Sequence, residues 1–196
     1  TGMPDNAQAL LAAMAAAPSF IMVGTMEPRK GHAQTLAAFE ELWLQGKNYN
    51  LFIIGKQGWH VDDLCERLRH HPQLNKKLFW LQNISDEFLT KLYSQSSALI
   101  FASLGEGFGL PLIEAAQKKL PVIIRDIPVF KEIAQEHAWY FSGEAPADIA
   151  KAVEDWLALY EQNAHPRSEN INWLTWKQSA EFLLKNLPII APAAKQ

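Results

Sequence analysis

The segment at residues 98–116, ALIFASLGEGFGLPLIEAA, predicts a strand, a loop and a helix in direct succession. Ala98 to Ala102 is a continuous apolar run with the length of a buried strand. Glycines alternate through the loop, and Pro111 stands in the first turn of the helix, where its missing N–H group has no consequence. Outward from this segment, strand and helix patterns alternate along the chain.

Further apolar runs on both sides of this segment are bounded by polar or helix-like residues, as buried strands are. Continuous apolar character, rather than alternation, is expected when helices cover both faces of a parallel sheet. Ala138 to Phe141 is a weaker run and a candidate edge strand. The stronger runs are Phe20 to Gly24, Leu51 to Gly55, Leu78 to Leu81 and Pro121 to Arg125.

Segments with helical periodicity lie between these runs. Residues 32–45 place Leu36, Phe39 and Trp43 on one stripe, and Gly46 ends the helix. Ser85 is a suitable N-cap for the helix after the third run. Further helices are expected over 61–70, 149–160 and 176–187. Because strands and helices alternate, the sequence predicts an α/β fold with a doubly wound parallel sheet, which is Rossmann-like.

Composition limits the classes of function. The net charge of -3 and pI of about 6.1 give no basic field, so no nucleic-acid partner is expected. Residues 7–17 are apolar but too short to span a bilayer. Cys65 is the only cysteine, which is consistent with a reducing compartment. We expect an N-terminal helix or interdomain linker over 1–18, one domain over 19–187 and a flexible tail over 188–196.

Ligands of open parallel sheets bind beyond the carboxyl ends of the strands, so functional residues are expected in the loops there. The loop after the first strand lacks the G-x-G-x-x-G pattern, which argues against an NAD-dependent oxidoreductase. It carries Arg29 and Lys30 before a helix N-terminus, where a cation is unfavourable unless an anion shares the site. A phosphate site and an ordinary basic turn both remain open for this loop.

The loop after the fourth strand favours an anion site more strongly. Gly105, Gly107 and Gly109 precede a helix whose free N–H groups can bind an anion, and glycine lets a diphosphate approach the main chain. Glu106 and Glu114 are eight positions apart. A carboxylate among the apolar neighbours of Glu114 needs partners such as sugar hydroxyls, although a surface glutamate would be the better interpretation of Glu114 alone.

These residues resemble a known family. Residues 105–115 carry the E-x7-E element of retaining GT-B glycosyltransferases of family four, and the similarity to its C-terminal donor-binding domain covers nearly the whole chain. The sequence segments EPRKGH, GKQGW and ISDE are most similar to those of bacterial mannosyl- and rhamnosyltransferases that build O-antigen. The other matching segments are 23–32 (VGTMEPRKGH), 54–59 (IGKQGW), 84–93 (ISDEFLTKLY), 128–133 (PVFKEI) and 173–180.

The resemblance implies roles position by position. Lys30, with Arg29 beside it, matches the lysine that holds the donor diphosphate. Glu106 matches the glutamate that contacts the donor sugar, and Glu114 the one that accepts from the ribose hydroxyls. Many members have arginine where this chain has Thr25, and Arg29 is expected to substitute. Lys30 and Glu106 are the expected catalytic residues; Gly107, Phe108, Gly109 and Leu110 are expected to meet the diphosphate through the main chain, and Gly55, Lys56, Gln82, Asn83 and Ile84 to line the base.

The resemblance also implies partners. The family has an N-terminal acceptor-binding domain, which has no counterpart here, so this chain is expected to bind a nucleotide sugar but to transfer it poorly or not at all. GDP-mannose is the indicated donor, and a glycan or a lipid-linked glycan the acceptor. No metal and no other cofactor is expected. Trp173 and Trp176 are expected to pack, or to contact the absent domain.

Two alternatives stay open: a UDP-sugar donor, and a non-catalytic nucleotide-binding or scaffold domain derived from such an enzyme. We expect a cytoplasmic location. For the full-length protein, a peripheral position at the inner face of the plasma membrane is left open.

Overall fold

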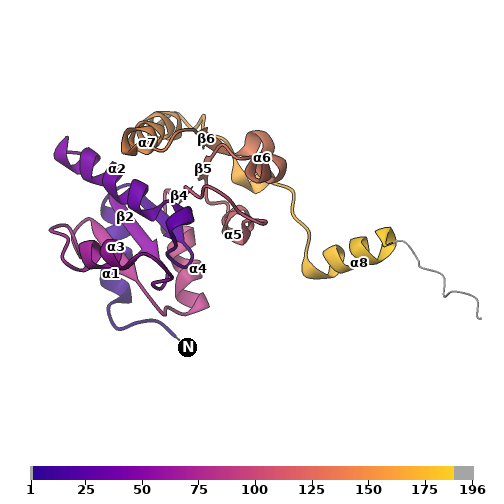
Figure 1. The fold of residues 1–196 in the computed structure, drawn as a ribbon, viewed down its shortest axis with the longest axis horizontal. Coiled ribbons are helices and arrows are strands. Elements are labelled where there is room, and N and C mark those ends of the chain that lie inside the picture. The colour runs from indigo at the N-terminus through magenta and orange to yellow at the C-terminus, as the bar shows by residue number, and fades with distance from the viewer. Residues whose placement is uncertain (1, 188–196) are drawn as a thin grey trace, which may run out of the picture.

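Six parallel strands form one sheet in the order β3-β2-β1-β4-β5-β6 (Figure 1). The chain is seen here as a computed structural model that describes residues 2–187. Each predicted strand is confirmed, with its ends shifted by a residue or less. The strands are β1 (Ser19–Val23), β2 (Asn50–Ile54), β3 (Leu78–Leu81), β4 (Ala98–Phe101), β5 (Val122–Arg125) and β6 (Trp139–Phe141).

Helices cover both faces of the sheet, and each face has its own apolar core. The core on one face is formed with α2 (His32–Leu44), α3 (Asp62–Arg69) and α7 (Pro146–Glu161). The core on the other face is formed with α1 (Ala7–Ala16), α4 (Asp86–Gln95), α5 (Leu110–Gln117) and α6 (Pro128–Ala134). Short 3-10 turns lie at η1 (Pro28–Lys30), η2 (Gln135–His137) and η3 (Ser168–Asn170).

Neighbouring strand residues point into different cores, which explains the continuous apolar runs. In β1, Phe20 and Met22 face the α2 side, whereas Ile21 faces the α4 side. The predicted N-cap is also confirmed, since the Ser85 hydroxyl accepts a hydrogen bond from the Phe88 N–H at 3.2 Å.

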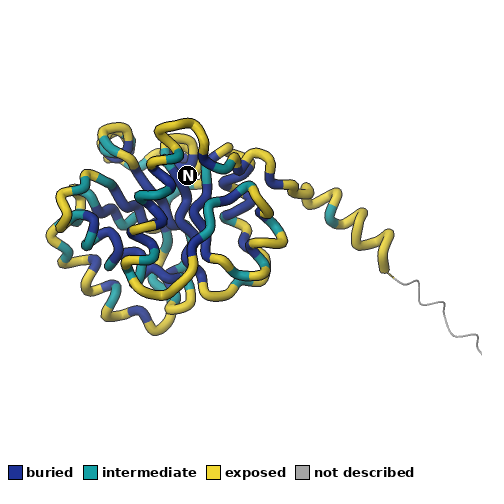
Figure 2. The backbone as a smooth tube through the Cα atoms, turned by 90° about the horizontal axis from the view of Figure 1, so that it is seen from above, coloured by how far each residue is buried: buried dark blue, intermediate teal, exposed yellow. Residues whose placement is uncertain are grey.

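The last helix, α8 (Trp176–Asn186), begins with a capping box between Thr175 and Gln178 and stands away from the body of the protein (Figure 2). None of its side chains is buried, and Trp176 is 81% exposed, so it does not pack against the described residues. The predicted tail over 188–196 lies outside the described residues. Within residues 2–187, no helix is long and apolar enough to cross a bilayer.

The strand order reverses between β1 and β4, because β2 and β3 lie on one side and β5 and β6 on the other. In a doubly wound sheet such a switch point leaves a crevice at the carboxyl ends of the two central strands. The loops after β1 and β4, which carry the predicted site residues, therefore meet at the same place.

Candidate functional site

The loops after β1 and β4 are joined directly. The Leu104 N–H donates to the Arg29 carbonyl at 2.8 Å. Gly31 has a left-handed φ of 74°, and a Cβ on it would lie 2.5 Å from the Ala102 carbonyl oxygen. Only glycine therefore lets the basic turn lie against the end of β4. This contact fixes the cations of one loop relative to the carboxylate of the other.

Arg29, Lys30 and Glu106 form one ionic cluster in this crevice. Lys30 Nζ lies 2.5 Å from Glu106 Oε1, and Arg29 Nη1 lies 3.2 Å from Glu106 Oε2. The Ser103 hydroxyl donates to Glu106 Oε1 at 2.6 Å, and Arg29 Nη1 donates to the Gly105 carbonyl at 2.8 Å. The Glu106 side chain is 8% exposed and that of Lys30 15%, whereas Arg29 is 43% exposed. Three of the charged residues predicted at the site are thus brought together.

The cluster keeps Glu106 ionised. Burial raises the pKa of Glu106, but hydrogen bonds from Lys30 and Ser103, the charge of Lys30 and a hydrogen bond from Arg29 together lower it below its usual value. The basic turn was expected to share its site with an anion. In the ligand-free chain that anion is the carboxylate of Glu106 itself.

The direct contact between Lys30 and Glu106, and the part played by Ser103, were missed in the sequence. Lys30 and Glu106 are 76 residues apart, and only the pairing of β1 with β4 brings them together. A serine directly after a predicted strand was the only available signal for Ser103, and such serines are common in turns.

The glycine loop presents free main-chain donors beside this cluster. Gly109, with a left-handed φ of 90°, is the N-cap of α5, and Pro111 lies in its first turn as predicted. Within the described chain, the N–H groups of Gly107, Phe108 and Gly109 have no hydrogen-bond acceptor. A Cβ at Gly105 or Gly107 would meet nothing within 4 Å. The loop therefore has open space and unpaired donors at a helix N-terminus, which suits an anion.

Glu114 differs from its predicted environment. Its side chain is exposed, because the apolar neighbours in α5 point into the core and Glu114 points away from it. It accepts a hydrogen bond from the Tyr93 hydroxyl at 2.8 Å. The argument that an apolar setting forces Glu114 to seek sugar hydroxyls is therefore wrong, although its side chain is accessible to a ligand. Tyr93, on α4, was not recognised in the sequence.

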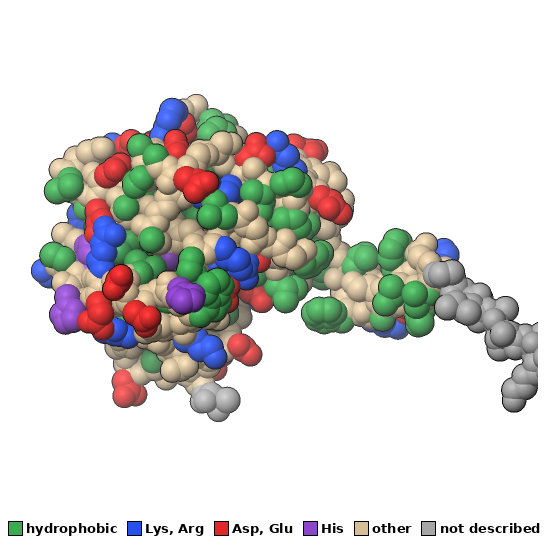
Figure 3. All heavy atoms as spheres, in the orientation of Figure 1, with side chains coloured by type: hydrophobic (Ala, Val, Ile, Leu, Met, Phe, Trp, Pro, Cys, Tyr) green, Lys and Arg blue, Asp and Glu red, His purple; other side chains and the backbone are tan. Residues whose placement is uncertain are grey.

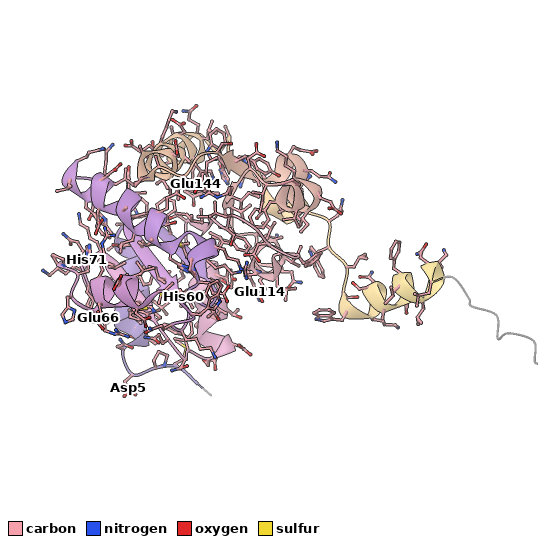
Figure 4. The ribbon with its side chains drawn as sticks, in the orientation of Figure 1. Asp5, His60, Glu66, His71, Glu114 and Glu144 are labelled. Carbon is pink, nitrogen blue, oxygen red and sulfur yellow. The ribbon has the colours of Figure 1, made fainter. Side chains whose placement is uncertain are left out.

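A groove of about 1170 Å³ begins at Glu114 and extends toward α8. Its walls include Phe108, Leu110, Trp173 and Trp176, which are all exposed. Figure 4 shows Glu114 on the side of the body that faces α8, and Figure 3 shows apolar side chains gathered over α8. The candidate site thus opens onto an apolar surface.

The residues expected to line the base lie at the same edge of the sheet. Gly55 and Lys56 follow β2, and the loop after β3 is residues 82–85. The Met26 N–H donates to the Lys56 carbonyl at 3.0 Å, and the Gly55 N–H to the Leu81 carbonyl at 2.9 Å. Gln82 and Asn83 are exposed and Ile84 is half-buried. These residues form a second wall beside the basic turn. In the described residues, no group of three or more His, Cys, Asp or Glu side chains could hold a metal ion.

A doubly wound parallel sheet defines a Rossmann-like α/β domain, and the two cations, the carboxylate and the free N–H groups at its switch point form a candidate anion site. The family described as "Glycosyl transferases group 1" matches residues 12–173, and the chain belongs to this family. The family and fold predicted from the sequence are therefore confirmed.

Two relatives show where the similarity lies. The chain is 93% identical over all 196 residues to the serotype-specific mannosyltransferase WbdA of Escherichia coli, of which it covers 24%. It is 31% identical over 137 residues to the O-antigen chain mannosyltransferase RfbU of Salmonella typhimurium, covering 69% of this chain and 37% of that protein. The chain spans about a quarter of the length of its nearly identical relative.

A solved structure supports the fold. Anabaena Alr3699/HepE, in complex with UDP and glucose, matches 95% of this chain and 53% of its own with a TM-score of 0.73, at 14% sequence identity. At that identity the likeness concerns the fold alone.

Proposed function

We propose that this chain is the donor-binding domain of a retaining, metal-independent hexosyltransferase of bacterial O-antigen synthesis, with GDP-mannose as donor. The observation that carries the proposal is the convergence of Arg29 and Lys30 with the free N–H groups of residues 107–109 at the switch point. A nucleoside diphosphate carries the charge and the oxygen acceptors that such a set of donors satisfies.

The proposed reaction breaks the bond between the sugar C1 and the diphosphate oxygen and forms a bond from C1 to an acceptor hydroxyl. Negative charge then builds on the leaving diphosphate. Arg29, Lys30 and the helix N-terminus neutralise this charge in place of a metal ion. Lys30 lies on the diphosphate side and Glu106, next to it, orients the sugar. Catalytic roles are thus proposed for Lys30 and Glu106.

The remaining contacts follow from the arrangement of the loops. Gly107, Phe108, Gly109 and Leu110 meet the diphosphate through the main chain, and exposed Glu114 accepts from the ribose hydroxyls. The base occupies the wall formed by Gly55, Lys56, Gln82, Asn83 and Ile84. The names of the two mannosyltransferase relatives support mannose as the sugar. No further cofactor is proposed. The acceptor is a glycan or lipid-linked glycan held by another domain, and the parent protein acts in the cytoplasm at the inner face of the plasma membrane.

Calorimetry with GDP, UDP and ADP, free and sugar-linked, tests the binding proposal. We expect GDP and GDP-mannose to bind, with affinity unaffected by EDTA and reduced by salt. Lys30→Ala should weaken GDP binding on the order of 10-fold or more, as expected for loss of a charge-assisted contact. Lys118→Ala removes the same charge at the far end of α5 and is the matched control. If none of the nucleotides bound, the proposal would be contradicted. If UDP bound more tightly than GDP, a UDP-sugar would replace GDP-mannose as the proposed donor.

Transfer is tested with a longer protein that contains this chain. We expect mannose to pass from GDP-mannose to a mannose-containing acceptor with retained configuration. A nucleotide-binding protein without transfer activity would instead support the non-catalytic alternative.

A further inference from the structure

Arg125 is a buried cation that the proposed site does not use. It ends β5, is 5% exposed, and its guanidinium lies 5.0 Å from the centre of the Phe141 ring. Nε donates to the Ala102 carbonyl at 2.9 Å, Nη1 donates to the Gly143 carbonyl, and Nη2 donates to Gln34 Oε1 at 2.5 Å. Among the described residues no carboxylate forms an ion pair with it within 4.0 Å, and the charges of Glu144 and Asp148 act on it from farther away. Burying a charge without a close counter-ion is unfavourable, so this arginine needs its carbonyl partners.

One partner of Arg125 is the main chain at the start of the glycine loop. Ala102 directly precedes Ser103, whose hydroxyl donates to Glu106. The Ala102 carbonyl is also the group against which Gly31 lies, so it takes part in the close approach of the loops after β1 and β4, beside the hydrogen bond from Leu104 to Arg29. Arg125 therefore holds the carbonyl from which both site loops are positioned.

The other partners of Arg125 come from separate elements. Gln34 lies in the first turn of α2, and its Nε2 donates to the Ala145 carbonyl at 2.8 Å. Gly143 follows β6. Arg125 thus links the carboxyl ends of β4 and β6 to α2, whose N-cap, Gly31, follows Lys30. The planar fork of a guanidinium can serve three such acceptors at fixed angles, which an ammonium on a flexible stem cannot do.

We propose that Arg125 is a positioning residue for donor binding. By fixing the Ala102 carbonyl, it sets the distance between Lys30 and the loop that carries Glu106 and the free N–H groups. This inference rests on the proposed function for its effect on nucleotide affinity, but its effect on the loop is independent of any ligand. Arg125 lies behind the loops and does not itself touch the donor.

The test compares Arg125→Lys and Gln34→Leu with Ile124→Val. Ile124 is fully buried in the same strand and faces the other core, so Ile124→Val destabilises the domain without touching the site loops. Amide proton and nitrogen NMR signals of Gly105, Gly107 and Gly109 are recorded for each ligand-free chain, and GDP affinity is measured by calorimetry. Urea unfolding gives the stability of every variant.

We expect Arg125→Lys to shift or broaden the three glycine signals and to weaken GDP binding on the order of 10-fold to 100-fold, as for small displacements of binding groups. Gln34→Leu, which leaves one guanidinium N–H unpaired at a half-buried position, should act in the same direction to a smaller extent. Ile124→Val should leave the signals and the affinity unchanged despite its loss of stability.

The positioning role would be overturned if Arg125→Lys and Gln34→Leu left the glycine signals of the folded chain unchanged. It would also be overturned if GDP affinity fell no further than in Ile124→Val. Should Arg125→Lys fail to fold, Gln34→Leu alone decides. If the unaltered chain bound no nucleotide, the proposed function would fail, whereas the glycine signals would still decide the role of Arg125.

Discussion

At the residue scale, the two cations of the site are already paired with Glu106 before any donor arrives. Under the proposed function, an incoming diphosphate must share or take over these partners. Glu106→Gln removes the competing charge, so we expect nucleoside diphosphate affinity to stay level or rise. Turnover of the longer transferase should fall, because the sugar loses an orienting carboxylate.

Calorimetry with GDP and a steady-state transfer assay on the same variant separate these two effects. A parallel fall of affinity and turnover would show that Glu106 supports donor binding as a whole. Glu114→Gln, which alters the exposed second glutamate, is the comparison variant. If Glu114 contacts the ribose as proposed, this change should weaken binding of GDP.

Two glycines of the loop should respond differently to alanine. At Gly109 the left-handed φ and a Cβ position 3.1 Å from the Phe130 ring make alanine unfavourable, so Gly109→Ala should destabilise the fold by roughly 1–3 kcal/mol. At Gly107 a Cβ meets nothing in the ligand-free chain. Gly107→Ala should therefore fold normally and lose GDP affinity, because the methyl group occupies the space of the diphosphate. Equal stability of the two variants in urea would contradict this distinction.

His32 predicts a pH dependence of stability. Burial, with the nearby charge of Lys30, lowers the pKa of His32 from 6.5 to about 4, and neither ring nitrogen has a hydrogen-bond partner among the described residues. Below pH 6.5 the unfolded chain takes up a proton that the folded chain refuses until about pH 4. Stability is thus fully present above pH 6.5 and falls toward pH 4, by at most about 1.4 kcal/mol per pH unit for this residue.

Urea unfolding between pH 7 and pH 4.5 measures this slope. His32→Leu should reduce this slope because it removes the titrating ring. The ring nitrogens have no hydrogen-bond partner, so the substitution breaks no hydrogen bond. The same change at exposed His70 should not reduce the slope. An unchanged slope in His32→Leu would show that His32 is not the titrating group.

At the scale of elements, the β1–α2 and β4–α5 connections make the site, and α8 takes no part in the fold of the domain. All residues of α8 are partly or fully exposed, Leu183 and Leu184 among them (Figure 2). Deleting residues 175–196 removes α8, none of whose side chains is buried, so we expect the free energy of unfolding to change by less than about 0.5 kcal/mol. The truncated chain should also self-associate less, because an apolar surface is removed.

Circular dichroism in urea and sedimentation velocity check these expectations. Leu183→Glu and Leu184→Glu in the undeleted chain are a second, independent test of self-association, because they remove apolar surface without shortening the chain. A clear loss of stability on truncation would mean that α8 packs on the domain in solution.

At the scale of the whole molecule, the sheet separates two cores and takes part in both. Because each strand contributes side chains to both layers, neither core can open alone, and we expect a single cooperative unfolding transition. The candidate site lies at the edge where all six strands end, so a diphosphate bound there, as proposed, would tie together loops from both halves of the sheet.

Ligand binding should therefore raise the stability of the entire domain. At a GDP concentration 100 times its Kd, linkage predicts about 2.7 kcal/mol, which corresponds to a rise in Tm on the order of 5–10 °C for a domain of this size. Differential scanning calorimetry measures the shift, which should fall to about half at the same GDP concentration in Lys30→Ala if that variant binds GDP about 10-fold more weakly. An identical shift in Lys30→Ala would place GDP somewhere else on the protein.

The strands, their order of succession and the cations and glycines of the site could be predicted from local patterns. A buried strand is recognised by an apolar run of residues, and a helix by apolar residues at helical spacing. The start of a helix is recognised by a capping residue or a proline. Helix α6 (Pro128–Ala134) has too few turns for its periodicity to be recognised, and it was matched only as a family segment. Glu114 was placed in apolar surroundings because its sequence neighbours are apolar, whereas their side chains point to the opposite side of α5.

The sequence by itself determined the doubly wound fold, the edge of the sheet where the site lies and the residue types that could bind an anion there. Only the tertiary structure decided which of these residues touch. The Lys30–Glu106 pair joins positions 76 residues apart, and Arg125 reaches the Ala102 carbonyl from a neighbouring strand. Such contacts depend on strand order and on the approach of Gly31 to β4, and neither of these is encoded in a local pattern, because both result from how all the layers pack together.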